Sequence, residues 1–300
     1  MIRLLHLTDP HLTRPEAKKF KQRRLKRFLG TQSWQRKRRH IHRSDTLQTV
    51  VDAVHSEAAD QIVVTGDLVQ VGLPEEIREA GVWLTQLGEP SQVRVIPGNH
   101  DAYAKDSQAA MIEQWGAYMG VQANFGGSLD EHYPVSWPLN KDGLRVNIIG
   151  LSSASPTPVL MASGRLGRDQ RARYGRHVRE PDVFECVLIH HPPLPRMSGW
   201  RKGLHDAKLF GRIVEERAPA LVLHGHVHAN SSHAQGSATR IFGTASASSA
   251  HTLHPASYRT FDISVLENQW MVSMSLKQLD LLSGQMQVIE TQSWRLDLQH

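Results

Sequence analysis

The 300-residue sequence contains a single cysteine, Cys186, and no long apolar run. One cysteine excludes an internal disulfide framework and a four-cysteine zinc site. No run approaches the roughly 20 apolar residues that a membrane-spanning helix needs, so we expect no such helix. The chain begins Met-Ile-Arg-Leu-Leu-His, which has neither the apolar core nor the cleavage site of a signal peptide. These absences predict a cytoplasmic protein.

Charge is distributed unevenly along the chain. The formal net charge is +6, yet residues 14–43 contain 13 Lys and Arg against one acid, Glu16. This segment carries +12, so the other 270 residues carry −6. The overall composition, 40% hydrophobic and 21% charged, is that of a globular protein and argues against global disorder. The basic segment is therefore a local feature rather than a property of the whole fold.

Short apolar, β-branched runs alternate with segments of helical periodicity, which predicts an α/β fold. From about residue 236 the pattern changes to period two, which predicts mostly antiparallel strands. We expect one domain over residues 1–300, with a basic helical insert at about 14–43 and a β-rich part from about 236. The buried strands are expected at 4–8, 62–65, 93–96, 145–151, 184–189 and 221–223.

A short polar motif follows five of the expected strands directly. In open α/β sheets, ligands bind beyond the carboxyl ends of the strands, so these five loops can converge on one edge. Glycine in three of the motifs allows the backbone to turn sharply and to approach a ligand closely. The motifs are Asp9-Pro10-His11, Gly66-Asp67, Gly98-Asn99-His100-Asp101, His190-His191-Pro192-Pro193 and Gly225-His226-Val227-His228.

The side chains of these motifs suit divalent first-row metals, because they offer carboxylates and imidazoles without a thiolate. Asp9 and His11 are two residues apart, as are His226 and His228, so each pair can face one ion in a tight loop. Asp67 has two oxygens and can bridge two ions. Two divalent ions with only two carboxylates leave a charge of about +2, which suits hydroxide and an anionic phosphate. The pattern indicates a metal-dependent phosphate chemistry.

In this order over residues 4–230, the motifs D-P-H, G-D, G-N-H-D, H-H-P-P and G-H-V-H resemble the calcineurin-like metallophosphoesterase superfamily. The resemblance implies a four-layer sandwich of two mixed β-sheets flanked by helices, with the metal site at the strand C-terminal ends. It also implies two divalent or mixed-valence ions, with Mn, Fe or Zn as the expected metals. The first ion would be held by Asp9, His11, Asp67 and His228, and the second by Asp67, Asn99, His190 and His226.

The same resemblance implies catalytic roles for His100 and Asp101. His100 would contact the phosphate and protonate the leaving oxygen, and Asp101 would orient His100. A hydroxide between the two ions would attack the phosphorus in line with the leaving group, without a covalent intermediate. Within the His190-His191 pair, His190 is assigned as the ligand because the family's ligand precedes an x-Pro sequence.

The substrate class is less closely specified. Gly66-Asp67 continues as Leu68-Val69-Gln70-Val71-Gly72, which lacks the second Asp and the Arg usual in the serine/threonine protein phosphatases of the superfamily. The H-H-P-P motif and the chain length are more similar to the class III branch of cyclic-nucleotide and glycerophosphodiester phosphodiesterases. The sequence therefore predicts hydrolysis of a phosphodiester or a pyrophosphate. A UDP-2,3-diacylglucosamine-type pyrophosphatase of lipid A synthesis, a nuclease and a non-enzymatic scaffold stay open.

The basic insert begins three residues after His11, which predicts that it covers the mouth of the active site. Phe20 and Phe28 recur at helical spacing among Lys and Arg, a pattern typical of an interfacial membrane helix. Peripheral binding at the inner face of the membrane is one expectation. A solvated basic hairpin and nucleic-acid contact are the alternatives. We expect the insert to determine where the enzyme works more than how it cleaves.

Overall fold

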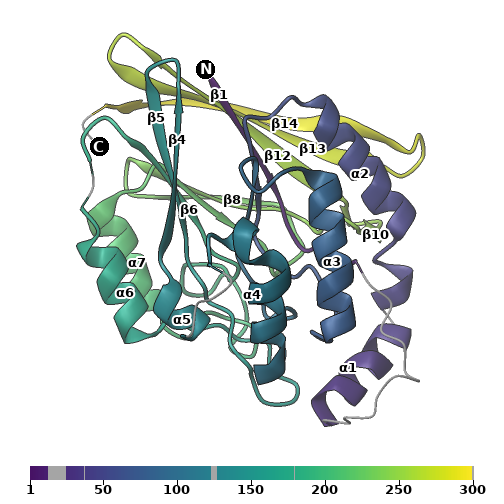
Figure 1. Cartoon of the computed structure of the whole chain (residues 1–300). Coiled ribbons are helices and arrows are strands. Elements are labelled where there is room, and N and C mark those ends of the chain that lie inside the picture. The colour runs from purple at the N-terminus through teal and green to yellow at the C-terminus, as the bar shows by residue number, and fades with distance from the viewer. Residues whose placement is uncertain (13–24, 37, 123–126, 179, 299–300) are drawn as a thin grey trace.

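The structure is a computed structural model that describes residues 1–12, 25–36, 38–122, 127–178 and 180–298. Two six-stranded mixed sheets form its centre, and helices flank them (Figure 1). This is the architecture that the sequence predicts. Among the described residues, no helix is long and apolar enough to span a membrane.

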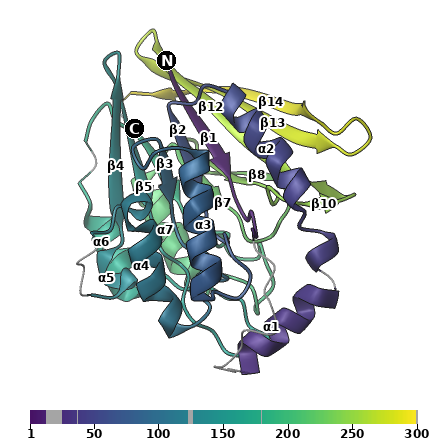
Figure 2. The ribbon, with the colours of Figure 1, turned by 45° about the vertical axis from the view of Figure 1, so that its right-hand side comes forward.

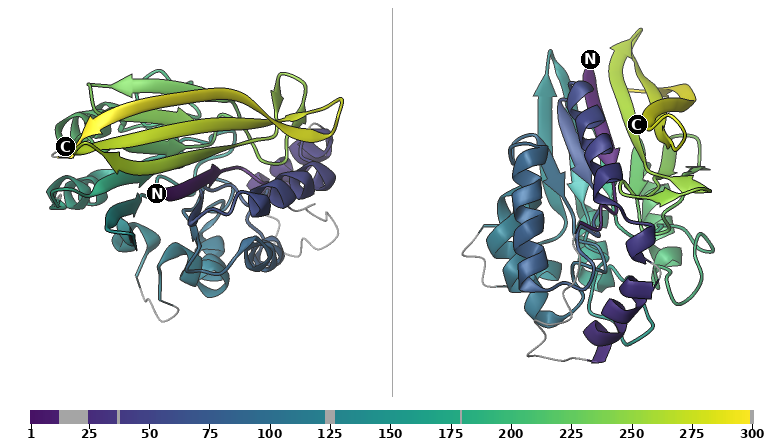
Figure 3. Two further views of the ribbon diagram at one scale, coloured as in Figure 1. Left: turned by 90° about the horizontal axis from the view of Figure 1, so that it is seen from above. Right: turned by 90° about the vertical axis from the view of Figure 1, so that its right-hand side faces the viewer.

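The first sheet joins the N-terminal strand to strands from the C-terminal part of the chain. Strand β1 runs parallel to β2, and β2 runs parallel to β3. On its other side, β1 pairs antiparallel with β12, which continues antiparallel through β13 and β14. Figure 3 shows these long C-terminal strands along one side of the molecule. The strands in spatial order are β14 (Gln285–Asp297), β13 (Gln269–Asp280), β12 (Ser257–Leu266), β1 (Ile2–Leu7), β2 (Gln61–Val64) and β3 (Val93–Val95).

The second sheet has four parallel strands between two antiparallel edge strands. Successive residues of its central strands point to opposite faces, and both faces are apolar, as in parallel sheets buried on both sides. Ile148 and Leu188 face the large core between the sheets, whereas Ile149 and Val187 face a second core on the other side. The strands in spatial order are β4 (Val135–Lys141), β5 (Leu144–Gly150), β6 (Phe184–Leu188), β7 (Leu221–His224), β9 (Thr239–Gly243) and β8 (Ser231–Gln235).

The helices occupy two sides of the molecule (Figure 1). The buried apolar faces of α2, α3 and α4 belong to the same core as the first sheet, and those of α6 and α7 cover the outer face of the second sheet. The smaller elements are α5 (Leu129–His132), β10 (Ala250–His251) and β11 (His254–Pro255). The longer helices are α2 (Ser44–Ser56), α3 (Pro74–Leu87), α4 (Lys105–Met119), α6 (Gly167–Arg176) and α7 (Ala207–Arg217).

The two edge strands of the second sheet, β4 and β8, escape prediction from the sequence. Strand β4 contains Pro138 and buries only Trp137 fully, and proline is tolerated at a sheet edge because it need not donate to a ladder. Strand β8 has the polar sequence Ser-Ser-His-Ala-Gln and buries none of it fully. Edge strands that bury so little carry no apolar periodicity, so the pattern could not reveal them.

The described part of the insert forms α1 (Leu25–Arg36) and a 3₁₀ turn, η2 (Arg38–His40). Helix α1 lies at the end of the molecule toward which β1 runs (Figure 2). In most helices apolar side chains are buried and charged ones are exposed, but α1 shows the reverse at three positions. Arg27 is buried, whereas Phe28 and Leu29 are exposed. Phe20, on which the membrane hypothesis also depends, lies outside the described residues.

Candidate metal centre

The candidate ligands stand on tight turns that follow the strands. Five of the seven have a positive φ: Asp9 (51°), His11 (45°), Asp67 (56°), His226 (71°) and His228 (54°). A positive φ is uncommon outside glycine and persists where the surroundings fix it. Hydrogen bonds fix it here, since the amides of Asp9 and His11 donate to the carbonyls of Gly66 and Asp67 at 3.0 and 3.1 Å. Such clustered strain is typical of a functional site.

Two glycines of the motifs are required by close packing around the carboxylates. A Cβ atom on Gly98 would lie 2.2 Å from Oδ1 of Asp67, and one on Gly225 would lie 2.3 Å from Oδ2 of Asp9. Both distances are far below van der Waals contact, so any side chain would displace the carboxylate. The close backbone approach expected at these glycines is present.

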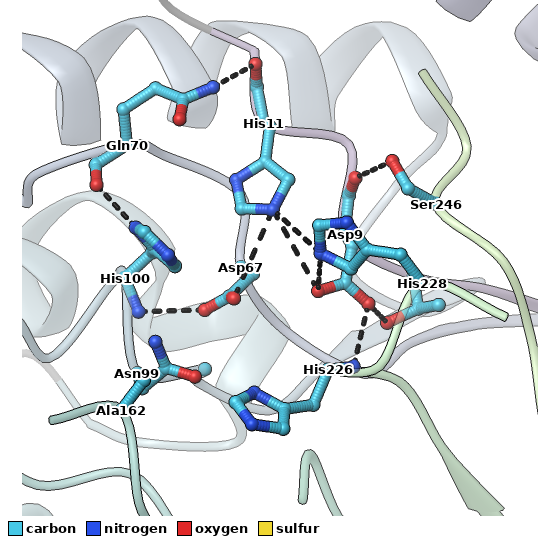
Figure 4. Close-up of polar contacts among 12 residues, drawn as sticks. Asp9, His11, Asp67, Gln70, Asn99, His100, Ala162, His226, His228 and Ser246 are labelled. Atoms are coloured by element: carbon cyan, nitrogen blue, oxygen red, sulfur yellow. Dashed lines mark hydrogen bonds and ion pairs between the residues drawn. The ribbon is translucent and has the colours of Figure 1, made fainter. Parts of the chain in front are cut away.

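The first group of ligand atoms comes from Asp9, His11, Asp67 and His228, and all lie within 4.8 Å of one another. Figure 4 shows these side chains directed at a common centre. Nε2 of His228 is 3.1 Å from Oδ1 of Asp9 and 3.2 Å from Nε2 of His11. Nε2 of His11 is 4.0 Å from Oδ2 of Asp67. The four residues proposed for the first ion are thus brought together.

The second group consists of Asp67, His190 and His226, again within 4.8 Å. Nε2 of His190 lies 3.3 Å from Oδ2 of Asp67 and 3.1 Å from Oδ1 of Asn99. Asn99 is therefore adjacent to this group, to which the family resemblance assigns the second ion. Asp67 belongs to both groups and lies between them.

The hydrogen bonds around the two groups fit metal ligation. Nδ1 of His11 donates to the carbonyl of Val69 (3.1 Å), and Nδ1 of His190 donates to the carbonyl of Thr65 (2.6 Å). Each of these bonds directs Nε2 of the ring at the centre, as the outer contacts of metal-binding histidines do. Oδ2 of Asp67 and Nε2 of His226 are buried without a hydrogen-bond partner among the described residues. Buried polar atoms are rarely left unsatisfied, and a divalent cation would satisfy both.

The pKa values of residues in the two ligand groups are those expected of a site that binds positively charged ions. Burial opposes ionisation of Asp9, but His228 beside it holds the pKa of that carboxyl below its usual range. Burial lowers the pKa of His190, while Asp67 raises it, with a net value of about 9. Burial lowers the pKa of His226 to about 3, so this imidazole keeps the lone pair that a metal needs.

His100 and Asp101 both lie beside the second group, but in different roles. Nδ1 of His100 donates to the carbonyl of Gln70, so this carbonyl orients the ring. The Asp101 carboxylate accepts backbone N–H groups instead, from Asp67, Leu68 and Gly98 at 2.8 Å. The Val69 amide also donates to it, at 3.1 Å, so four backbone amides converge on the carboxylate. The Gln70 carbonyl therefore orients His100 in place of Asp101. Asp101 positions the loop that carries Asp67.

The insert contributes two residues that the sequence analysis did not place at the site. The His42 ring lies 4.4 Å from that of His11, and His42 can form a third group of ligand atoms with His11 and His228. Nη1 of Arg38 lies 3.0 Å from Nε2 of His100. The only signal in the sequence is the run Arg38-Arg39-His40-Ile41-His42, whose histidines stand out in a basic segment.

We expect metal loading to raise the melting temperature, because the ion satisfies buried atoms that otherwise lack partners. Saturation at 1,000 times the dissociation constant stabilises a folded chain by about 4 kcal/mol. For a chain of this size that is a rise of roughly 8 °C. The measurement is a thermal melt of chelator-treated protein with and without Mn²⁺. His226→Ala should lose most of the shift and the exposed His233→Ala should keep it; equal shifts in both would contradict the assignment.

Comparisons with known proteins agree with this geometry. A family model described as "Calcineurin-like phosphoesterase" matches residues 2–230. The chain is 28% identical over 174 residues to a probable cyclic nucleotide phosphodiesterase of Synechococcus, covering 56% of this chain and 58% of that relative. It is 25% identical over 236 residues to a 3',5'-cyclic adenosine monophosphate phosphodiesterase of Haemophilus influenzae, covering 76% of this chain and 70% of the relative.

Among solved structures, a dimetal phosphatase from Danio rerio matches with a TM-score of 0.53 and 11% identity. The match covers 97% of this chain and 98% of that one, so the two proteins share a fold. The family match spans well over half of the chain and includes all five motifs. The chain therefore belongs to the calcineurin-like phosphoesterase family, as its motifs predict, and its enzyme class is that of a metal-dependent phosphoesterase.

Proposed function

We propose that the protein is a dinuclear metal-dependent phosphodiesterase, with a cyclic nucleotide as the first substrate to test. The observation that carries the proposal is the position of Asp67, whose carboxylate belongs to both groups of ligand atoms. The names of the two relatives support a phosphodiester as the substrate.

Seven side chains would hold the metal ions. When bound, two divalent ions supply positive charge for the phosphoryl oxygens and lower the pKa of water at the site. The chain provides the frame for them: Oδ1 of Asp67 accepts the His100 amide at 2.7 Å, which leaves Oδ2 facing the centre. The proposed set is Asp9, His11, Asp67 and His228 for one ion, and Asp67, Asn99, His190 and His226 for the other.

His100 is the residue proposed to protonate the leaving oxygen. Its side chain is buried at the edge of a cavity beside Asn99, and the Gln70 carbonyl fixes its ring. Burial, and after it the charge of Arg38, lowers the pKa of His100 to about 4. A bound phosphoryl group brings negative charge to the ring and favours its protonated form. His100 can then hold the proton that the leaving oxygen receives.

The test is a substrate panel with the Mn-loaded protein. The panel contains 3',5'-cyclic AMP, a glycerophosphodiester, a UDP-linked lipid, single-stranded DNA and bis-p-nitrophenyl phosphate. We expect turnover of phosphodiesters well above that of p-nitrophenyl phosphate, a monoester. Preference for the monoester, or no turnover of any compound by fully loaded protein, would contradict the proposal; the second result would favour a scaffold.

We further propose contact of the insert with an anionic membrane. Helix α1 exposes Phe28 and Leu29 within a basic segment, and each Lys or Arg near such a surface gains about 1 kcal/mol. Phe28→Ser should weaken co-sedimentation with phosphatidylserine vesicles while leaving turnover of bis-p-nitrophenyl phosphate intact. Leu282→Ser is the control, since Leu282 is 98% exposed on the distant β13–β14 turn. Equal sedimentation of both variants would rule out an apolar contact through α1.

A further inference from the structure

The described part of the insert is fixed to the body of the protein at both ends. At one end, the buried Arg27 guanidinium donates to the carbonyls of Gly72 (2.7 Å) and Val71 (3.2 Å) and pairs with Asp106 (2.8 Å). At the other end, the amide of Arg43 donates to the carbonyl of Ser248 (2.9 Å). The 3₁₀ turn η2 lies between these attachments, so its place beside the metal centre is set by the fold.

From this turn, the Arg38 side chain contacts His100, the residue proposed to protonate the leaving oxygen. Its Nη1 lies 3.0 Å from Nε2 and 3.3 Å from Nδ1 of His100. Because Nδ1 of His100 already donates to Gln70, Nε2 is the acceptor that faces the guanidinium. Among the described residues, no carboxylate lies within ion-pair distance of Arg38. Burial lowers the pKa of this side chain from its ordinary value, while the charge of Asp67 acts in the opposite direction without cancelling the shift.

Arg38 also faces a cavity of about 400 Å³ that opens beside the metal ligands. The polar residues lining it include Arg38, Asn99, His100, Arg201 and Lys202, and no carboxylate lines it among the described residues. Leu29, from α1, is part of its apolar wall. A cavity with three cationic side chains and an apolar wall is suited to an organic phosphate, whose charged group meets the cations.

We propose that Arg38 binds a non-bridging oxygen of the substrate's phosphoryl group, so that the basic insert supplies part of the active site. The proposal rests on the function proposed above and adds a residue to it. A guanidinium gives phosphate charge-assisted hydrogen bonds, often two in parallel. When phosphate takes the Nη1 hydrogen bond, Nε2 of His100 is released toward the leaving oxygen. Arg38, which has no carboxylate at ion-pair distance among the described residues, thus finds an anionic partner in the substrate.

The chain contains a matched control for this assignment. Arg39 is the next residue in the same turn, carries the same charge and is exposed, donating to its neighbour His40 at 3.0 Å. Arg38→Gln and Arg39→Gln therefore remove the same charge from the same turn, but only the first removes it from the cavity. Arg38→Lys keeps the charge and loses the planar fork.

The experiment is calorimetric titration of inorganic phosphate into each Mn-loaded protein, with metal content measured on the same samples. We expect phosphate to bind at least 10-fold more weakly to Arg38→Gln than to the parent, with an intermediate loss in Arg38→Lys. Arg39→Gln should stay within twofold of the parent. All variants should retain the parent's metal content, because Arg38 is not a ligand. Equal affinities of Arg38→Gln and Arg39→Gln, or a parent that binds no phosphate, would overturn the assignment.

Kinetic measurements distinguish binding of the substrate by Arg38 from an effect of Arg38 that acts only through the position of His100. They also test Arg38 separately from the proposed phosphodiesterase function. Arg38→Gln should lower kcat/KM for bis-p-nitrophenyl phosphate by on the order of 10², partly through KM, because it loses substrate contact. The same substitution in a His100→Ala background should still weaken phosphate binding. If it has no effect in that background, Arg38 acts only through His100 and the proposal fails. A parent that binds phosphate through Arg38 but turns over no phosphodiester would contradict the proposed function alone.

Discussion

Asp67→Asn is expected to reduce turnover of every phosphodiester by on the order of 10³ or more while the protein stays folded. Lewis-acid stabilisation by an ion amounts to several kcal/mol, and a loss of about 4 kcal/mol corresponds to about 10³ in rate. The amide keeps the shape of the carboxylate but removes the charge that both ligand groups share. The measurements are kcat with a saturating diester and metal content by elemental analysis.

A carboxylate of similar size outside the site provides the control. Asp52 is exposed on α2, so Asp52→Asn should retain both activity and metal content. Because Oδ1 of Asp67 also accepts the His100 amide, circular dichroism and melting must show that Asp67→Asn is folded. Normal turnover with full metal content in folded Asp67→Asn would contradict the proposal that Asp67 is a ligand of both ions.

His100→Ala is expected to lower the rate by on the order of 10² to 10⁴ for substrates with poor leaving groups. The loss should be much smaller with p-nitrophenyl esters, because p-nitrophenolate leaves without needing a proton. The comparison is kcat/KM for the two kinds of ester, with the exposed His233→Ala as the control variant. Equal losses on both esters would mean that His100 stabilises the phosphoryl group instead of protonating the leaving oxygen.

The fold and the clustering of the motifs were predictable because both depend on local patterns. Buried parallel strands such as β6 and β7 are apolar throughout, and the motif after each strand must lie at the strand's carboxyl end. The sequence therefore placed Asp9 and Asp67 near each other although they are 58 positions apart in the chain. The assignment of each ligand to one ion stays a proposal, since it came from family resemblance.

The contributions of the insert could not be predicted, because they depend on contacts between distant segments. Arg27 is charged, and charged side chains are mostly exposed to solvent in folded proteins. Its guanidinium is nevertheless buried against main-chain carbonyls. The spacing of apolar residues in the sequence does not indicate which surface such a segment packs against. The insert was expected to cover the mouth of the active site and to determine where the enzyme works more than how it cleaves. That expectation did not anticipate Arg38 beside His100 or His42 beside His11.

The hydrogen bonds that His100 and Asp101 form with main-chain groups could not be predicted from the sequence either. Any residue type at position 70 would present a carbonyl, so nothing about Gln70 indicated that it holds the His100 ring. Asp101 follows His100 directly, and the pairing of neighbours was a reasonable expectation. The turn instead directs the carboxylate at the backbone amides of Asp67 and Leu68, a geometry that only the folded loops define.

The central claim is that two metal ions share the carboxylate of Asp67. The most direct measurement is a crystal structure of the Mn-loaded protein with anomalous diffraction at the manganese edge. We predict two peaks about 3.5–4 Å apart, the separation of two-metal hydrolytic sites, each in contact with Asp67. One ion should lie beside His11 and His228, and the other beside His190 and His226. A single peak at saturating Mn²⁺, or two peaks of which one does not touch Asp67, would contradict the account.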